Sequence, residues 1–168
     1  MLLKKVNMEK KYKLTDETIN VYGRTLHRIE ALKDFGDVKK GDKGGFIEKE
    51  GNLSQSDNCR VYGNAKVFGN ANVFSNAKVY DSAKVYGNAE ICADAKVESN
   101  GDYIVFKNWW SSGRYFTWTR SNNMWKVGCF FGTGEELIAK AYKDSELSGR
   151  EYERVVRYVK SILNEDRI

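Results

Sequence analysis

The chain has 168 residues, of which 41% are hydrophobic, and a formal net charge of +5. This composition excludes a globally disordered chain and suits one domain, or one domain with appendages. No apolar run approaches the roughly 20 residues of a membrane-spanning helix, and the N-terminus lacks the features of a signal peptide, so we expect a cytoplasmic protein without membrane attachment.

Residues 1–46 are predicted to form a small N-terminal β cap. Residues 25–32 (TLHRIEAL) alternate in side-chain character, which is typical of a half-buried strand. The segment that follows is rich in Gly, Asp and Lys and reads as turns. Within it, GDKGG at 41–45 is interpreted as a turn that caps the first coil, with phosphate binding as the alternative.

A six-residue repeat, of the form VYGNAK, runs from Val61 to Asn100. In each hexad the aliphatic residue and the alanine should point inward, and the Gly-Asn pair should form a corner where a positive φ is tolerated. Such a strict period is typical of a left-handed parallel β-helix. If Ile47 and Leu53 begin the first two hexads, the β-helix covers 47–100 in about three coils, with two extra residues bulging out before Val61.

Residues three hexads apart should stack on the outside of the coil and form three faces. The first face carries Arg60, Tyr62, Lys78, Tyr80, Lys96 and Glu98; the second Lys66, Phe68, Lys84 and Tyr86; the third Asn72, Phe74, Glu90 and Cys92. Two faces therefore interleave aromatic rings with cations. Either the C-terminal region or a second subunit covers these rings, or they form a recognition surface, or they reflect strand propensity alone.

Residues 101–168 are predicted to form an antiparallel β meander followed by an αα-hairpin. The strand-like segments are YIVFKNWW, RYFTWTRS and MWKVGCFF. Thr133 begins the first helix with a T-G-E-E capping box, and Ser148 is predicted to begin the second with S-G-R-E. The whole chain is thus expected to be mainly β with a two-helix tail.

The usual catalytic groups are sparse. His27 is the only histidine and is interpreted as structural, and no Cys/His spacing indicates a metal site. Cys59, Cys92 and Cys129 show no pairing pattern, and Cys129 lies among apolar residues, where we expect it to be buried. We therefore predict a protein that is not an enzyme and needs no cofactor.

The candidate contact residues are aromatic and cationic side chains of the coil and the meander, because Trp, Tyr and Arg dominate binding hot spots. Around Trp110, the alternative is a hairpin core with charged edges. The predicted partner-binding residues are Arg60, Tyr62, Lys66, Lys78, Tyr80, Lys84, Trp110, Arg114 and Arg120.

The chain resembles a group of uncharacterised hexapeptide-repeat proteins of bacteriophages and prophages. The resemblance lies in YKLTDET from residue 12, in residues 25–54, in the YGNA hexads, and in GCFFGTGEEL followed by a helix. It implies a phage origin and a location in the infected bacterium, and it brings no activity. Similar tails are expected to carry a His-Gly pair where this chain has Asp144 and Ser145, so no role of that histidine is carried over.

The first hypothesis is a binding protein that inhibits a host defence component, such as a CRISPR effector, by occupying a protein surface. The second is a sponge that sequesters a signalling nucleotide through aromatic stacking and Arg–phosphate contacts. An acyltransferase-like protein and a structural or assembly protein are further alternatives. A nucleic-acid partner is allowed by the charge, and we expect a homo-oligomer, either a trimer through coil faces or a dimer through the C-terminal helices.

Overall fold

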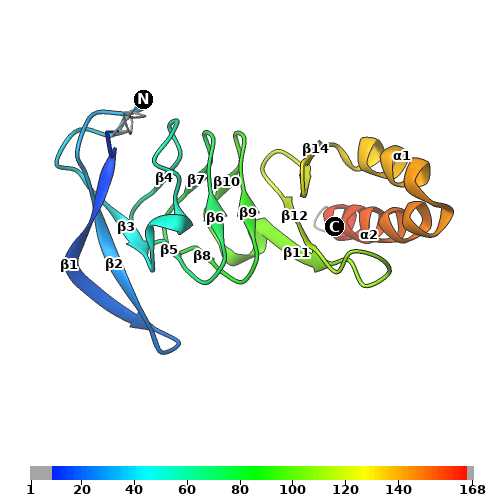
Figure 1. Ribbon diagram of the computed structural model, residues 1–168, viewed down its shortest axis with the longest axis horizontal. Helices are drawn as coiled ribbons and strands as arrows, with labels where there is room; N and C mark the ends of the chain where they lie inside the picture. Colours follow the sequence, from blue (N-terminus) through cyan, green and yellow to red (C-terminus); the bar gives the residue numbers. More distant parts are fainter. Residues whose placement is uncertain (1–8, 166–168) are drawn as a thin grey trace, which may run out of the picture.

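The computed structural model describes residues 9–165, so the start of the predicted β cap and the segment considered for a signal peptide lie outside the described residues. An N-terminal hairpin, a stack of parallel strands, an antiparallel sheet and two helices follow one another along the long axis (Figure 1). The protein is mainly β with two C-terminal helices, as the sequence predicts.

The parallel stack is made of very short strands, one from each hexad. They are β4 (Arg60–Val61), β5 (Lys66–Val67), β6 (Asn72–Val73), β7 (Lys78–Val79), β8 (Lys84–Val85), β9 (Glu90–Ile91) and β10 (Lys96–Val97). They pair in the orders β4-β7-β10, β5-β8 and β6-β9, all parallel, so the chain returns to the same sheet after every third strand. We call residues 47–97 the parallel coil.

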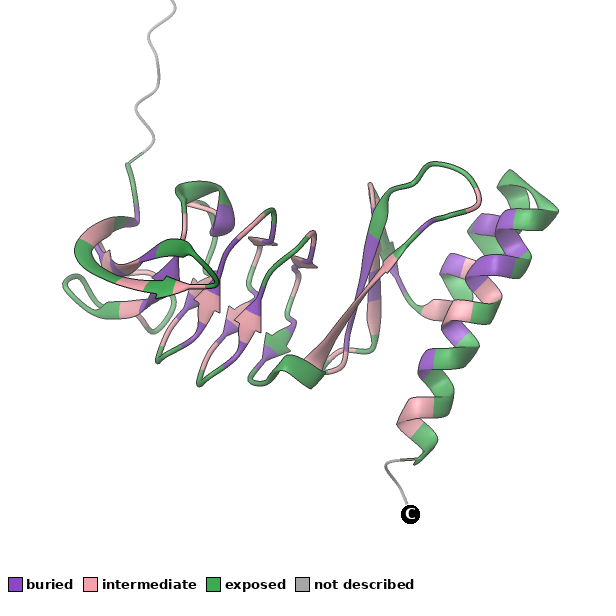
Figure 2. Cartoon of the chain, turned by 90° about the horizontal axis from the view of Figure 1, so that it is seen from below, coloured by how far each residue is buried: buried purple, intermediate pink, exposed green. Residues whose placement is uncertain are grey.

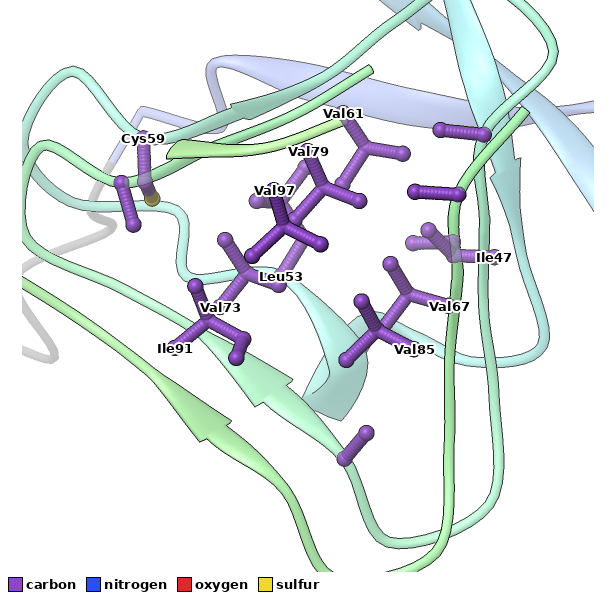
Figure 3. Packing of buried hydrophobic residues seen from close by; sticks show 14 of the residues in the cluster. Ile47, Leu53, Cys59, Val61, Val67, Val73, Val79, Val85, Ile91 and Val97 are labelled. Carbon is purple, nitrogen blue, oxygen red and sulfur yellow. The ribbon is translucent and has the colours of Figure 1, made fainter. Parts of the chain in front are cut away.

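The interior of the parallel coil contains three stacks of aliphatic side chains that face one another (Figure 3). The stacks are Val61, Val79 and Val97; Ile47, Val67 and Val85; and Leu53, Val73 and Ile91, all at most 1% exposed. The alanines of the hexads are equally buried, and Cys59 occupies the equivalent position before the first of them. Because nearly all of this surface is apolar, its removal from water stabilises the coil layer by layer.

The corners adopt the predicted left-handed backbone. The third residue of each of six successive hexads has a positive φ, between 54° and 68°: Gly63, Gly69, Ser75, Asp81, Gly87 and Ala93. This conformation costs glycine little but is unfavourable for a residue with a Cβ. Ala93 is therefore the least favourable residue at a corner, since it lacks even the short polar side chain of Ser75 or Asp81.

The N-terminal segment extends one sheet of the parallel coil. β1 (Tyr12–Val21) and β2 (Arg24–Ala31) form an antiparallel hairpin, and β2 pairs with β3 (Lys43–Ile47), which pairs in parallel with β5. The strand predicted at 25–32 is confirmed. The interpretation of 41–45 as a turn is wrong for Lys43, Gly44 and Gly45, which lie in β3. A Cβ on Gly45 would come within 2.6 Å of the Ala65 carbonyl oxygen, so glycine is needed there.

The C-terminal region contains a four-stranded antiparallel sheet in the order β11-β12-β13-β14. Its elements are the 3₁₀ turn η2 (Asn100–Asp102), β11 (Tyr103–Lys107), β12 (Tyr115–Thr119), β13 (Met124–Val127), β14 (Phe130–Gly132), α1 (Gly134–Asp144) and α2 (Glu146–Glu165). The segment predicted as one strand at 124–131 is divided between β13 and β14. Cys129 lies in the turn between them and is exposed, so the prediction that it is buried is wrong.

The helix starts differ in how well they were predicted. Thr133 caps α1 with the predicted capping box, since its hydroxyl accepts the Glu136 N–H and the Glu136 carboxylate accepts the Thr133 N–H. The prediction that Ser148 begins α2 is wrong, because the helix starts at Glu146. The cap is Ser145, whose hydroxyl accepts the Ser148 N–H at 3.0 Å.

Side chains of the C-terminal region close the last coil. Backbone N–H groups of the last coil would lack the partners that each earlier coil finds in the next one, because no further coil follows. Three side-chain oxygens accept hydrogen bonds from such N–H groups: Asn100 Oδ1 from Lys84 N (2.9 Å), Thr117 Oγ1 from Glu90 N (3.0 Å) and Ser121 Oγ from Lys96 N (2.7 Å). Side-chain hydrogen bonds thus join the C-terminal region to the coil, and within residues 9–165 no strand of the antiparallel sheet pairs with a strand of the coil.

A buried lysine closes the first coil. The wider loop before Val61, which follows the 3₁₀ turn η1 (Glu50–Asn52), turns its carbonyl groups toward Lys11, whose side chain is almost completely buried. Its Nζ donates to the carbonyl oxygens of Ser56, Asp57 and Cys59 at 2.8–3.2 Å. Burial lowers the pKa of Lys11, yet the three carbonyls satisfy all of its donors. The loop holds the two extra residues that the sequence predicts, since Ile47 to Val67 is a longer step than Val67 to Val85.

Candidate binding site

One face of the parallel coil brings four of the predicted contact residues together. On the sheet β4-β7-β10 the register places Arg60, Lys78 and Lys96 in one row, at neighbouring positions on successive strands. The rings of Tyr62 and Tyr80 form a second row, stacked with centroids 5.1 Å apart and planes within 9° of parallel. We call these five residues the cation–tyrosine face.

The cations of this face differ in their surroundings. The Arg60 guanidinium lies over the Tyr62 ring at 4.4 Å and forms an ion pair with Asp37. Within residues 9–165, neither Lys78 nor Lys96 forms an ion pair. Their charges are therefore available to a partner.

An acidic edge borders the cation–tyrosine face. Glu98 lies directly after the end of β10 and beside Asp81. A hydrogen bond and charge repulsion between these two carboxyl groups raise the pKa of Glu98. Partial desolvation and the nearby Glu98 raise the pKa of Tyr80. The face is thus polarised, with positive charge in the lysine row and negative charge at one side.

Lys66 and Lys84 lie on a different face of the coil. Lys66 Nζ donates to the Asn64 carbonyl oxygen, and Lys84 Nζ lies 5.2 Å from the centre of the Tyr22 ring at the tip of the hairpin. The adjacent Phe68 is 3% exposed, because the N-terminal hairpin packs over it. The interpretation that the C-terminal region or a second subunit covers the outward rings is therefore wrong for Phe68.

The three predicted residues of the C-terminal region do not join the cation–tyrosine face. Trp110 packs edge-on against Tyr152 at 4.9 Å and donates to Ser148 Oγ at 3.2 Å, so it is a core contact. Arg114 is exposed. Arg120 lies over the Trp118 ring at 5.8 Å and donates to the Gly101 carbonyl oxygen. The nine predicted contact residues therefore do not form one surface.

Sequence reasoning missed a pocket of about 240 Å³ beside Arg60. It lies between the first coil and the loop that joins β2 to β3. Its lining residues are Tyr12, Ile29, Ala31, Phe35, Asp37, Val38, Asp42, Lys43, Gly44, Leu53, Arg60, Val61 and Tyr62. The only signal in the sequence was the apolar pair Phe35 and Val38 in an otherwise polar loop, where the two residues pair across a tight turn.

The remaining reactive side chains have structural partners or stand alone. His27 Nδ1 lies 3.0 Å from the Thr15 carbonyl oxygen within the hairpin. All three cysteines are free, and burial raises the pKa of Cys92 to about 11. In the part of the chain that the structure describes, no three His, Cys, Asp or Glu side chains come together in a way that could hold a metal ion.

Comparisons with known proteins add no family. No family model matches the chain, and no curated protein is significantly similar to it. Neither helix in residues 9–165 combines the length and the apolar character needed to cross a membrane.

Proposed function

We propose that this chain is a non-enzymatic binding protein whose cation–tyrosine face docks on an acidic protein surface. The observation that carries the proposal is the pair of parallel rows, one of stacked tyrosines and one of cations, of which Lys78 and Lys96 have no ion-pair partner among residues 9–165. Tyrosine supplies large contact area with little loss of entropy, and lysine supplies complementary charge. The coil holds both rows on a regular backbone.

We further propose that the partner is a host anti-phage defence complex in an infected bacterium and that binding inhibits it. The support is the resemblance of the hexads and of the GCFFGTGEEL segment to phage and prophage proteins. The parallel coil is, in this proposal, the left-handed parallel β-helix of such proteins, because the six-residue period from Val61 onward is strict. Self-association through coil faces or helices belongs to the same proposal.

The test is phage plating on bacterial strains that each carry one defined defence system. Expression of the chain should raise the plating efficiency on one strain. The double variant Lys78→Glu and Lys96→Glu should abolish the effect, because charge reversal brings like charges together at the interface. With the purified defence complex, its affinity should fall by about tenfold or more.

The matched control is the double variant Lys66→Glu and Lys107→Glu, which makes the same change in net charge away from the cation–tyrosine face. It should retain the effect on plating. Circular dichroism should show that both variants are folded. If the variant on the face protects phage as well as the control does, this surface is not the docking site.

A further inference from the structure

The pocket beside Arg60 has an apolar floor that is continuous with the core of the parallel coil. Tyr12, Ile29, Leu53 and Val61 line it, and all four belong to the buried cluster that fills the coil. Leu53 and Val61 are inward-facing residues of the first coil and are labelled in Figure 3. The pocket therefore lies at the end of the coil's interior, where no earlier coil covers these side chains.

The polar side of the pocket is dominated by one guanidinium. The Arg60 side chain is only 14% exposed, and its Nε is buried without a hydrogen-bond partner among residues 9–165. A buried donor without an acceptor is costly, so an acceptor that reached it would be bound favourably. Arg60 is held in place by its contact with the Tyr62 ring.

The carboxylate that pairs with Arg60 is easily displaced. Asp37 lies on the loop between β2 and β3, and its side chain is 69% exposed. Because the Asp37 carboxylate itself remains largely in water, its release from Arg60 costs it little solvation, and a competing anion could take its place. The other charged groups of the lining have other partners: Asp42 accepts the Lys39 N–H at 2.9 Å, and Lys43 pairs with Glu17.

We propose that this pocket binds a small organic anion, with its apolar ring on the floor and its anionic head on the guanidinium of Arg60 in place of Asp37. The guanidinium suits both a carboxylate and a phosphate monoester, because its planar fork of donors matches either group. The rings of Phe35 and Tyr62 in the lining favour an aromatic body. The pocket shares Arg60 and Tyr62 with the cation–tyrosine face, but anion binding in it does not require that a protein docks on that face.

The test uses phenylacetate and phenyl phosphate as probes, with benzyl alcohol as the uncharged comparison, in titrations of the full chain followed by NMR. Both anions should bind saturably, and the alcohol at least tenfold more weakly. The anion that binds with the higher affinity shows whether the pocket prefers a carboxylate or a phosphate head group. Arg60→Met keeps the apolar stem of the side chain and should weaken anion binding by at least about tenfold, because a charge-assisted contact is lost.

Asp37→Asn should have the opposite effect and strengthen anion binding, because it removes the competing carboxylate. Asp34→Asn is the matched control: it makes the same charge change in the same loop, but Asp34 does not line the pocket. It should leave the affinity as in the wild type. The proposal is overturned if neither anion binds, or if Asp37→Asn and Asp34→Asn change the affinity equally.

Discussion

The parallel coil and the C-terminal region reach stability in different ways. The coil repeats one small layer, in which three aliphatic residues and their neighbouring alanines fill the interior. The C-terminal region depends on a few large rings, above all Trp118, Trp125 and Phe116, packed between the sheet and the helices. Figure 2 shows the difference, since burial recurs along the coil but follows one stripe of the helices. Stability is therefore spread evenly in one region and concentrated in the other.

The largest effect should come from Trp118→Ala. Trp118 is fully buried, and its Nε1 donates to Asn123 Oδ1 at 2.8 Å. Removing a core tryptophan should lower the free energy of unfolding by about 3–5 kcal/mol. Val79→Ala in the centre of the coil removes two methyl groups and should cost about 2 kcal/mol. Urea unfolding would measure both, and a larger cost for Val79→Ala would contradict the comparison.

Thr117→Val tests the junction between the two regions. The substitution keeps the shape of a side chain that is 1% exposed but leaves the Glu90 N–H without its acceptor. We expect a loss of about 1–3 kcal/mol, the cost of a buried unpaired donor, and faster hydrogen exchange at the Glu90 amide. Thr119→Val, on the same strand, should leave that amide protected. Equal exchange in the two variants would show that Thr117 does not close the coil.

Ala93→Gly should stabilise the coil. Ala93 has a φ of +55°, which is unfavourable for a residue with a Cβ. Because glycine adds flexibility to the unfolded chain, the net gain should be only about 0.5–1 kcal/mol. Ala89→Gly, at a buried inward position, should instead destabilise the protein. Thermal unfolding would distinguish them, and a lower melting temperature for Ala93→Gly would contradict the corner assignment.

Glu98→Gln should have the smallest effect, and one that depends on pH. The pKa of Glu98 is raised by Asp81 in the folded chain. Protonated Glu98 therefore contributes to the free energy of unfolding. That contribution is fully present below the ordinary pKa of a glutamate and is lost as the pH rises through the raised pKa. The advantage of Glu98→Gln over wild type should accordingly grow with pH in the acidic range. Denaturant titrations of both proteins at several pH values would measure it, and an advantage of Glu98→Gln that does not change with pH would contradict the contact with Asp81.

Periodicity explains how much of the fold the sequence predicts. In the coil, the position of a residue within its hexad determines whether its side chain points inward, forms a corner or lies in an outward row. The alignment of Arg60 with Lys78 on neighbouring strands could therefore be predicted directly. The capping box at Thr133 is similarly local. The start of α2 was missed because Ser148 matches the same pattern by chance. Its Glu151 is buried and pairs with Arg154 instead of returning to a cap.

The candidate site was only partly predictable because its remaining parts come from distant segments. The hairpin that covers Phe68 is separated from it by many residues, and no repeat indicates that it packs there. The same holds for the loop that places Asp37 on Arg60. Side-chain rows within the coil could be read from the sequence, whereas the surfaces that the two terminal regions cover depend on packing that no local pattern encodes.

The closed ends of the coil have a consequence for how such a chain can change in length. Equivalent residues such as Asn70 and Asn88 lie 18 positions apart. A tandem duplication of that many residues would add one layer, about 4.8 Å high, and would return the C-terminal sheet to the same side of the coil. Duplication of one hexad ahead of the last coil would turn that sheet to a neighbouring side relative to the N-terminal hairpin, although Asn100, Thr117 and Ser121 would keep their contacts with the last three hexads. Only insertions of whole turns therefore preserve how the two terminal regions are placed relative to each other.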